Sequence, residues 1–347
     1  MLVTKIRAKE IRTMTHDLTT GKPLRDIWQF AVPVLFGLLL QQVYSLVDTA
    51  IVGHALGVMA LGGVGATGSV NFLVIGFCGG LCTGMAIPLA QAFGAGDYRQ
   101  LRRYVAGCVW LGIAMSALLL ALTLPTTRAL LKLMGTPEEQ MGYAYDYIFI
   151  IFIGIPATIL YNMGACVLRS LGDSKSPVWF LAIASVINIV LDLLTVCVLG
   201  MGVAGAAVAT VFAQMFVFIL FIFAIRKRHP LYRGLKLAEP RPFQYYAQII
   251  RIGLPLSLQD MLFSCCSMLI ARFVAVYGDG AVAAQKVGTQ VESLSWMAAD
   301  GFMAAINAFI SQNYGAGQLD RVKAGYRSIM KIVLVWGSLC TLLLVFL

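Results

Sequence analysis

Long apolar runs dominate the sequence and restrict what the chain can fold into. Each run spans about 20 residues or more, which is the length an α-helix needs to cross the hydrocarbon core of a bilayer. Hydrophobic residues make up 59% of the 347 residues and charged residues only 12%, about half the charged share of a soluble domain. Because backbone polar groups inside a bilayer need partners within their own segment, the sequence predicts an all-α membrane protein.

The apolar runs predict about nine membrane-spanning helices. Their expected ranges are 28–55, 62–92, 104–124, 143–168, 177–199, 203–225, 247–277, 284–312 and 326–347. Most of the 26 Lys and Arg residues then fall on one side of the membrane, and cytoplasmic loops carry such an excess. We therefore expect a multi-pass protein of the cell membrane, with lipid around it and its N-terminus in the cytoplasm. The net charge of +10 reflects this topology, so we expect no nucleic-acid partner.

Two stretches far apart in the chain resemble each other. "QAFGAGDYRQLRRYV" begins at Gln91 and "QNYGAGQLDRVKAGY" begins at Gln312, each after a long apolar run. Pro33 and Pro255 stand early in the first and seventh predicted helices, so we expect matching helix bends there. Two homologous lobes in parallel orientation, each of six helices in a complete repeat, account for these matches.

The repeat divides the chain into four parts. They are a cytoplasmic N-terminal segment (1–26), an N-lobe with helices one to six (27–225), a basic cytoplasmic linker (226–246) and a partial C-lobe with helices seven to nine (247–347). The ninth run reaches Leu347 without a polar tail, so we expect a sequence truncated after its ninth helix. Since one chain supplies both lobes, we expect a monomer.

Polar side chains from four predicted helices fall at a similar depth in the N-lobe. They are Gln41, Asp48, Tyr147, Asn188, Asp192 and Thr210. A charged side chain at the bilayer centre costs about 2.5–3.5 kcal/mol on insertion scales, and Asn188 and Asp192 share one helix face. Oxygen groups suit a hard cation or a shared proton, so we expect a cation- or proton-coupling site. The alternative is a structural polar network.

The predicted C-lobe offers further candidates for a central cavity. They are Asp260, Met261, Phe263, Trp296 and Asp300, of which the two acids lie within predicted spans. By contrast, we interpret Arg169, Asp173 and Lys175 in "LRSLGDSKSP" as an ordinary charged inner loop.

Several motifs resemble those of one transporter family. "FAVPVLFGLLLQQVYSLVDTAIVGHALG", "QAFGAGD", "LRSLGDSKSP", "INIVLDLLTV" and "GVAGAAVATVFAQ" are similar to sequences of the multidrug and toxic compound extrusion (MATE) family. The resemblance covers residues 22–347 and implies a secondary antiporter with two six-helix lobes. Members export organic cations and drugs in exchange for H⁺ or Na⁺, and no other cofactor is implied.

The resemblance also implies roles for particular residues. It gives Asp48 the coupling role, matches Asn188, Asp192 and Thr210 to the same site, and assigns the helix bend to Pro33. These four polar residues are then also the candidate Na⁺ ligands. Some members carry a glutamate where this chain has Phe263, so the resemblance does not extend to a second-lobe cation site.

Two alternatives to an antiporter remain at this stage. A flippase for lipid-linked precursors would belong to the same superfamily, but it would need basic residues in the interior, and the predicted spans contain almost none. An intramembrane aspartyl protease could use Asp48 and Asp192 to activate water, yet neither residue stands in the sequence context of that class. We therefore expect a transporter and not an enzyme, with neither its substrate nor the choice of H⁺ or Na⁺ defined.

Overall fold

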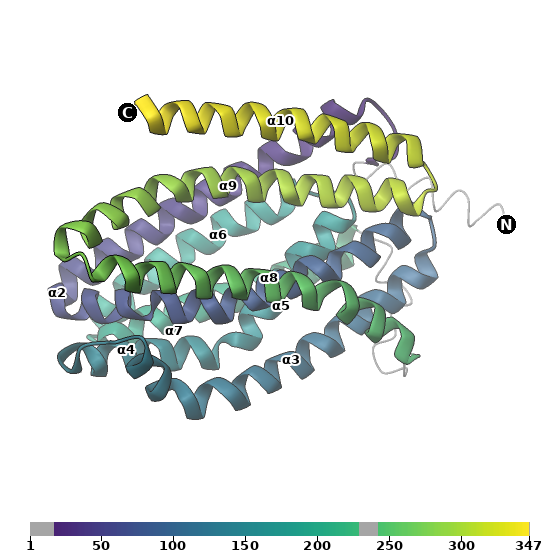
Figure 1. Ribbon diagram of the computed structural model, residues 1–347. Helices are drawn as coiled ribbons and strands as arrows, with labels where there is room; N and C mark the ends of the chain where they lie inside the picture. Colours follow the sequence, from purple (N-terminus) through teal and green to yellow (C-terminus); the bar gives the residue numbers. More distant parts are fainter. Residues whose placement is uncertain (1–16, 229–241, 347) are drawn as a thin grey trace.

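The computed structural model describes residues 17–228 and 242–346, which form helices joined by short turns (Figure 1). The elements are α2 (Pro23–Gly94), α3 (Tyr98–Leu133), α4 (Glu138–Ile153), α5 (Ile155–Ser170), α6 (Lys175–Asp192), the π-helical turn η1 (Leu193–Val198), α7 (Gly202–Arg228), α8 (Phe243–Ala275), α9 (Asp279–Gly315) and α10 (Leu319–Phe346). The predicted all-α fold is confirmed. Most of the predicted N-terminal segment and of the linker (1–16 and 229–241) lies outside the described residues.

The long element α2 is two antiparallel helices joined at Gly57. Gly57 has φ 84° and ψ 179°, which interrupts the helix, and a residue without Cβ adopts this backbone most readily. Figure 1 shows α2 running away from the N-terminal end of the bundle and doubling back. The two halves correspond to the helices predicted at 28–55 and 62–92.

The fourth predicted helix, 143–168, is not continuous. It is divided at Gly154 into α4 and α5, whose axes differ in direction by 52°. Pro156 stands in the first turn of α5, and its missing N–H prevents α4 from continuing through it. Beyond the bend, α5 packs against α2, α3 and α7.

Six helices in the described part of the chain are long and apolar enough to cross a bilayer, or seven if the bent pair of α4 and α5 is one span. The segments predicted at 284–312 and 326–347 are helical, as α9 and α10, but they are not among these six or seven. That they cross the membrane stays a prediction.

The two copies of the repeated motif form turns of the same geometry. Gly96 has φ 70° and Gly317 has φ 73°, and each N–H donates to a carbonyl three residues earlier, Phe93 and Tyr314, at 3.0 Å. Equal hydrogen bonds at equivalent positions are what two copies of one structural unit would show.

These repeated motifs also contact each other. A Cβ on Gly94 would lie 1.9 Å from the Gln312 carbonyl oxygen, and one on Gly315 would lie 2.0 Å from the Gln91 carbonyl oxygen. The two helix ends therefore cross backbone against backbone, which only glycine permits at both positions.

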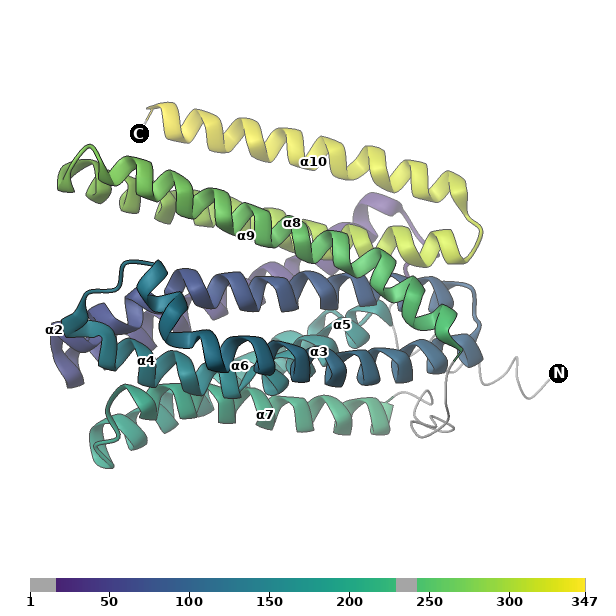
Figure 2. The same cartoon turned by 60° about the horizontal axis from the view of Figure 1, so that its bottom comes forward.

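The second half of α2 packs against α8 in a similar way. A Cβ on Gly84 would lie 2.2 Å from the Cα of Gly253, and one on Gly80 would lie 2.7 Å from the Cα of Ser257. Small residues four apart let membrane helices approach this closely. Figure 2 shows α8, α9 and α10 on one side of the molecule and α3 to α7 on the other, so α2 joins the two sides.

The two prolines expected to bend their helices both lie inside long helices. Pro33 lies inside α2 and Pro255 inside α8, as expected for residues early in the first and seventh spans. That the two helices bend at these positions stays a prediction.

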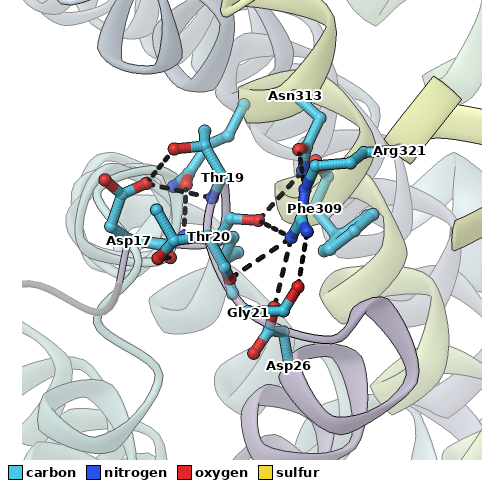
Figure 3. A network of polar contacts seen from close by, with 10 residues as sticks. Asp17, Thr19, Thr20, Gly21, Asp26, Phe309, Asn313 and Arg321 are labelled. Atoms are coloured by element: carbon cyan, nitrogen blue, oxygen red, sulfur yellow. Dashed lines mark hydrogen bonds and ion pairs between the residues drawn. The ribbon is translucent and has the colours of Figure 1, made fainter. Parts of the chain in front are cut away.

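One arginine fastens the segment before α2 to the other side of the molecule (Figure 3). Arg321 of α10 donates to the carbonyl oxygens of Leu18 (3.0 Å), Thr20 (3.2 Å) and Gly21 (2.6 Å). It also donates to Asn313 Oδ1 at 2.9 Å and forms an ion pair with Asp26 Oδ2 at 3.2 Å. We call these six residues the Arg321 network.

Candidate functional site

Asp48 of α2 and Asp192 of α6 bring their carboxyl groups together inside the N-lobe. The two groups are close enough to interact electrostatically; Asp192 is fully buried and Asp48 is half-buried. Because an ionised carboxylate only accepts hydrogen bonds, a direct bond between two such groups requires a proton on one of them. The pair can therefore share a proton or hold a cation between its oxygens.

The backbone changes form directly after Asp192. The chain continues as the π-helical turn η1, in which the Leu199 N–H donates to the Leu194 carbonyl oxygen at 2.8 Å. Such turns are rare and occur frequently at functional sites. The apolar sequence of η1 predicted an ordinary helix, so this feature was missed.

Asn188 and Thr210 adjoin the carboxyl pair. Asn188 lies one turn before Asp192 and is 3% exposed; its Nδ2 donates to Thr210 Oγ1 at 3.4 Å. Thr210 in turn donates to the Ala206 carbonyl oxygen at 3.1 Å. These bonds use the amide nitrogen of Asn188 and leave its oxygen available.

Two tyrosines flank the carboxyl groups. Tyr147 of α4 is buried, and both it and Tyr44 of α2 interact electrostatically with Asp48 and Asp192. Tyr147 is one of the predicted residues, whereas Tyr44 was missed. Tyr44 stands one helical turn before Asp48, but this spacing alone does not distinguish it from a packing residue.

Several oxygens of this cluster have no donor in the described part of the chain. They are Asp48 Oδ1, Asn188 Oδ1, and both carboxyl oxygens of Asp192. Because buried polar atoms nearly always have a hydrogen-bond partner, it is unusual to find four oxygen atoms without a donor in one cluster. Its chemistry fits a proton or a hard cation, which both favour oxygen. We call Tyr44, Asp48, Tyr147, Asn188, Asp192 and Thr210 the carboxylate site.

A cavity of about 260 Å³ lies between α2, α5, α6 and α7. Gln41, Tyr44, Asn188 and Thr210 line it. Since Tyr44 also interacts with both carboxyl groups, the cavity extends to the carboxylate site. The structure thus brings all six predicted N-lobe residues to this cavity or to the carboxyl groups beside it.

The interpretation of Arg169 as part of a charged inner loop is wrong. Arg169 stands in the last turn of α5 and lines the cavity. Asp173 does lie in the turn, where its Oδ1 accepts the N–H of Ser176 at 2.9 Å, and Lys175 begins α6. The long apolar run of α5 extends to its C-terminal end, and this places the cation inside.

Comparison with known protein families identifies the family of this chain. The sequence profile named MatE matches residues 33–194 and 255–347. The chain belongs to the MatE family. The predicted family of multidrug efflux transporters is thereby confirmed, and with it a multi-pass membrane protein.

This MatE protein has bacterial and archaeal relatives. The probable multidrug resistance protein YoeA of Bacillus subtilis is 33% identical, over 97% of this chain and 75% of its own length. A FAD transporter of Shewanella oneidensis is 27% identical, over 95% and 74%. A crystal structure of MATE in the bent conformation matches with a TM-score of 0.84 and 26% identity, over 94% and 72%. A MOP superfamily transporter from Pyrococcus furiosus matches with a TM-score of 0.85 and 25% identity, over the same shares.

The C-lobe candidates of this MatE protein are more dispersed. Asp260 lies beside Gly80 of α2 and interacts with Asp300, so both acids are near the boundary of the lobes. Phe263 and Trp296 make an edge-to-face contact with ring centroids 4.9 Å apart. These two and Met261 are exposed, and their role in binding a substrate stays a prediction.

Proposed function

We propose that this protein is a secondary antiporter that exports organic cations in exchange for H⁺ or Na⁺. The exchange takes place at the carboxylate site. The observation that carries the proposal is a pair of interacting carboxyl groups, Asp48 and Asp192, that retain oxygens without a donor in the described residues. Export is supported by the relatives named as multidrug resistance proteins.

The coupling follows from the repulsion between the carboxylates. When a proton or Na⁺ enters, it neutralises part of the charge of Asp48 and Asp192 and draws α2 and α6 together. When it leaves, the two like charges separate these helices again. Because α2 and α6 both line the cavity, the two states differ in cavity shape and in affinity for the exported cation, as antiport requires.

The proposal includes the setting of the protein. It works as a monomer in the cell membrane with its N-terminus in the cytoplasm, the orientation that places most basic residues inside. The coupling ion descends its gradient inward through the N-lobe while the organic cation leaves.

Transport in reconstituted liposomes tests this function. Efflux of the cationic dye ethidium is driven by a pH gradient and by a Na⁺ gradient in separate assays. Asp48→Asn and Asp192→Asn should each reduce gradient-driven efflux to the level of empty liposomes, because an amide neither exchanges a proton nor balances a cation. Asp146→Asn, which alters an exposed carboxyl of α4, should leave efflux unchanged. Unchanged efflux in Asp192→Asn would refute the coupling role.

A further inference from the structure

The side chains that line the N-lobe cavity include one positive charge and no negative charge. Residues of α2, α5, α6 and α7 line it, and among them Arg169 alone carries a full charge. No Asp or Glu belongs to the lining. A cation inside the protein is usually paired, so the absence of an acid from the lining of this cavity needs an explanation.

The guanidinium of Arg169 is sparsely bonded. An arginine has five N–H donors, yet in the described residues the one hydrogen bond of Arg169 runs from Nη2 to the Cys166 sulfur at 3.3 Å. Sulfur is a weak acceptor. Asp173, the acid nearest in sequence, accepts the backbone N–H groups of Lys175 and Ser176 with its Oδ1. Most donors of Arg169 therefore remain available to a ligand.

Neighbouring side chains add polar groups to the same cavity. Tyr161 and Asn162 lie two turns before Arg169 on the lining face of α5. Gln214 accepts a hydrogen bond from Thr158 Oγ1 at 2.6 Å through Oε1, so its amide nitrogen is left to donate. The position of Arg169 in the last turn of α5 offsets part of the cost of its charge, because the helix C-terminus is partially negative.

The cavity is long enough to separate this group from the carboxylate site. Its lining extends from Ser174, directly before α6, to Asn188 of α6, about 21 Å along a helix. Arg169 adjoins the Ser174 end and the carboxyl groups adjoin the Asn188 end. The two charged groups can therefore act on different ligands, or on different ends of one ligand.

We propose that the Arg169 end of the cavity binds an oxyanion, a phosphate or carboxylate group carried by a small organic molecule or a lipid. The planar fork of arginine matches two oxygens of such a group. A volume of about 260 Å³ accommodates a bicyclic ring with its anionic group. Binding at this site requires no ion gradient, so it stands or fails independently of antiport.

The test compares two fluorescent probes that share the same 4-methylcoumarin ring and differ at position 7. The purified protein in detergent is titrated with 4-methylumbelliferyl phosphate and with its uncharged analogue 7-methoxy-4-methylcoumarin. We expect the phosphate to bind at least ten-fold more tightly. Arg169→Gln should abolish this preference and Arg169→Lys should retain part of it. The matched control Lys175→Gln, which removes an exposed cation near the same end of the cavity, should bind like the wild type. Equal affinity for the two probes, or an unchanged preference in Arg169→Gln, overturns the proposal.

A measurement on the unaltered protein covers the case in which Arg169→Gln does not fold. Phenylglyoxal modifies accessible arginines, and mass spectrometry reports the extent at Arg169. The phosphate probe should slow modification of Arg169 several-fold and leave the exposed Arg327 unaffected. Equal rates with and without the probe overturn the proposal. Dihexanoyl phosphatidylglycerol and inorganic phosphate are then compared as competitors: displacement of the probe by the lipid alone identifies a headgroup, and displacement by phosphate identifies a free anion.

Discussion

The Arg321 network and the carboxylate site are polar clusters of opposite construction. Arg321 donates to three carbonyl oxygens, to Asn313 and to Asp26, so the groups around it are paired. In the carboxylate site, Asp48 and Asp192 retain oxygens without a donor in the described residues. A saturated cluster fixes one arrangement of the chain, whereas an unsaturated one changes with whatever fills it.

This difference predicts that the two clusters respond oppositely to substitution. Changes in the Arg321 network should reduce the stability of the fold and leave ion coupling intact. Changes in the carboxylate site should weaken or remove coupling and spare the fold. The predictions below test this division.

The largest effect on stability is expected for Arg321→Ala. The change leaves the Asp26 carboxyl, the Asn313 amide oxygen and the carbonyl oxygens of residues 18, 20 and 21 without their common donor. Removing one partner of a fully buried ion pair costs about 3–5 kcal/mol; Arg321 is about one fifth exposed, so we expect about 2–3 kcal/mol and a melting temperature in detergent lower by about 5 °C. Tryptophan fluorescence during heating gives this value.

Arg327→Ala on the same helix is the matched control, because Arg327 is exposed. Its melting temperature should stay within about 1 °C of the wild type, since surface substitutions rarely change stability by much. If both variants melt alike, the Arg321 network has no special role in holding the segment before α2.

A smaller effect of opposite sign is expected for the stability of Asp192→Asn. The substitution removes the repulsion that arises whenever both carboxyl groups are ionised, and it supplies an amide that can donate to Asp48. A gain of about 1–2 kcal/mol should raise the melting temperature by a few degrees, even though transport is lost. A melting temperature several degrees below that of the wild type would place Asp192 among the residues that stabilise the fold.

The smallest effect is expected for Asn188→Ala. It removes one neutral oxygen from the carboxylate site while both charges remain, so transport should survive with weaker ion binding. The ion concentration that gives half-maximal efflux should rise about ten-fold, which corresponds to about 1.4 kcal/mol. Thr210→Ser, which keeps the hydroxyl that accepts from Asn188, should change it little. If the ion concentration for half-maximal efflux is unchanged in Asn188→Ala, Asn188 does not contribute to ion binding.

Much of the carboxylate site was predictable from the sequence. Acids and amides are rare inside apolar runs, and helical rise converts their positions into depth, so Asp48, Asn188 and Asp192 could be placed in one layer. Tyr44 could not be singled out, because an aromatic residue in a membrane helix usually packs or faces lipid. The π-helical turn after Asp192 leaves no recognisable pattern in "LLTVCV".

Other parts depend on contacts that span the whole chain. Arg321 contacts Leu18 and Asp26, which lie about 300 residues away in the sequence. No local sequence pattern predicts a partner so far away. Arg169 was misplaced because a charge near the end of an apolar run reads as a loop residue. The break at Gly154 has a visible cause in Pro156, but the angle between α4 and α5 is decided by what α5 packs against.

The central claim is that Asp48 and Asp192 exchange the coupling ion, and the ion flux itself tests it most directly. Ethidium is added to one side of liposomes that hold the protein and no imposed gradient, while trapped pyranine reports H⁺ and ²²Na⁺ reports sodium. The wild type should move one of these ions opposite to the dye in a fixed ratio, and the double variant Asp48→Asn, Asp192→Asn should move neither. A double variant that still exchanges the ion at the wild-type ratio would contradict the account.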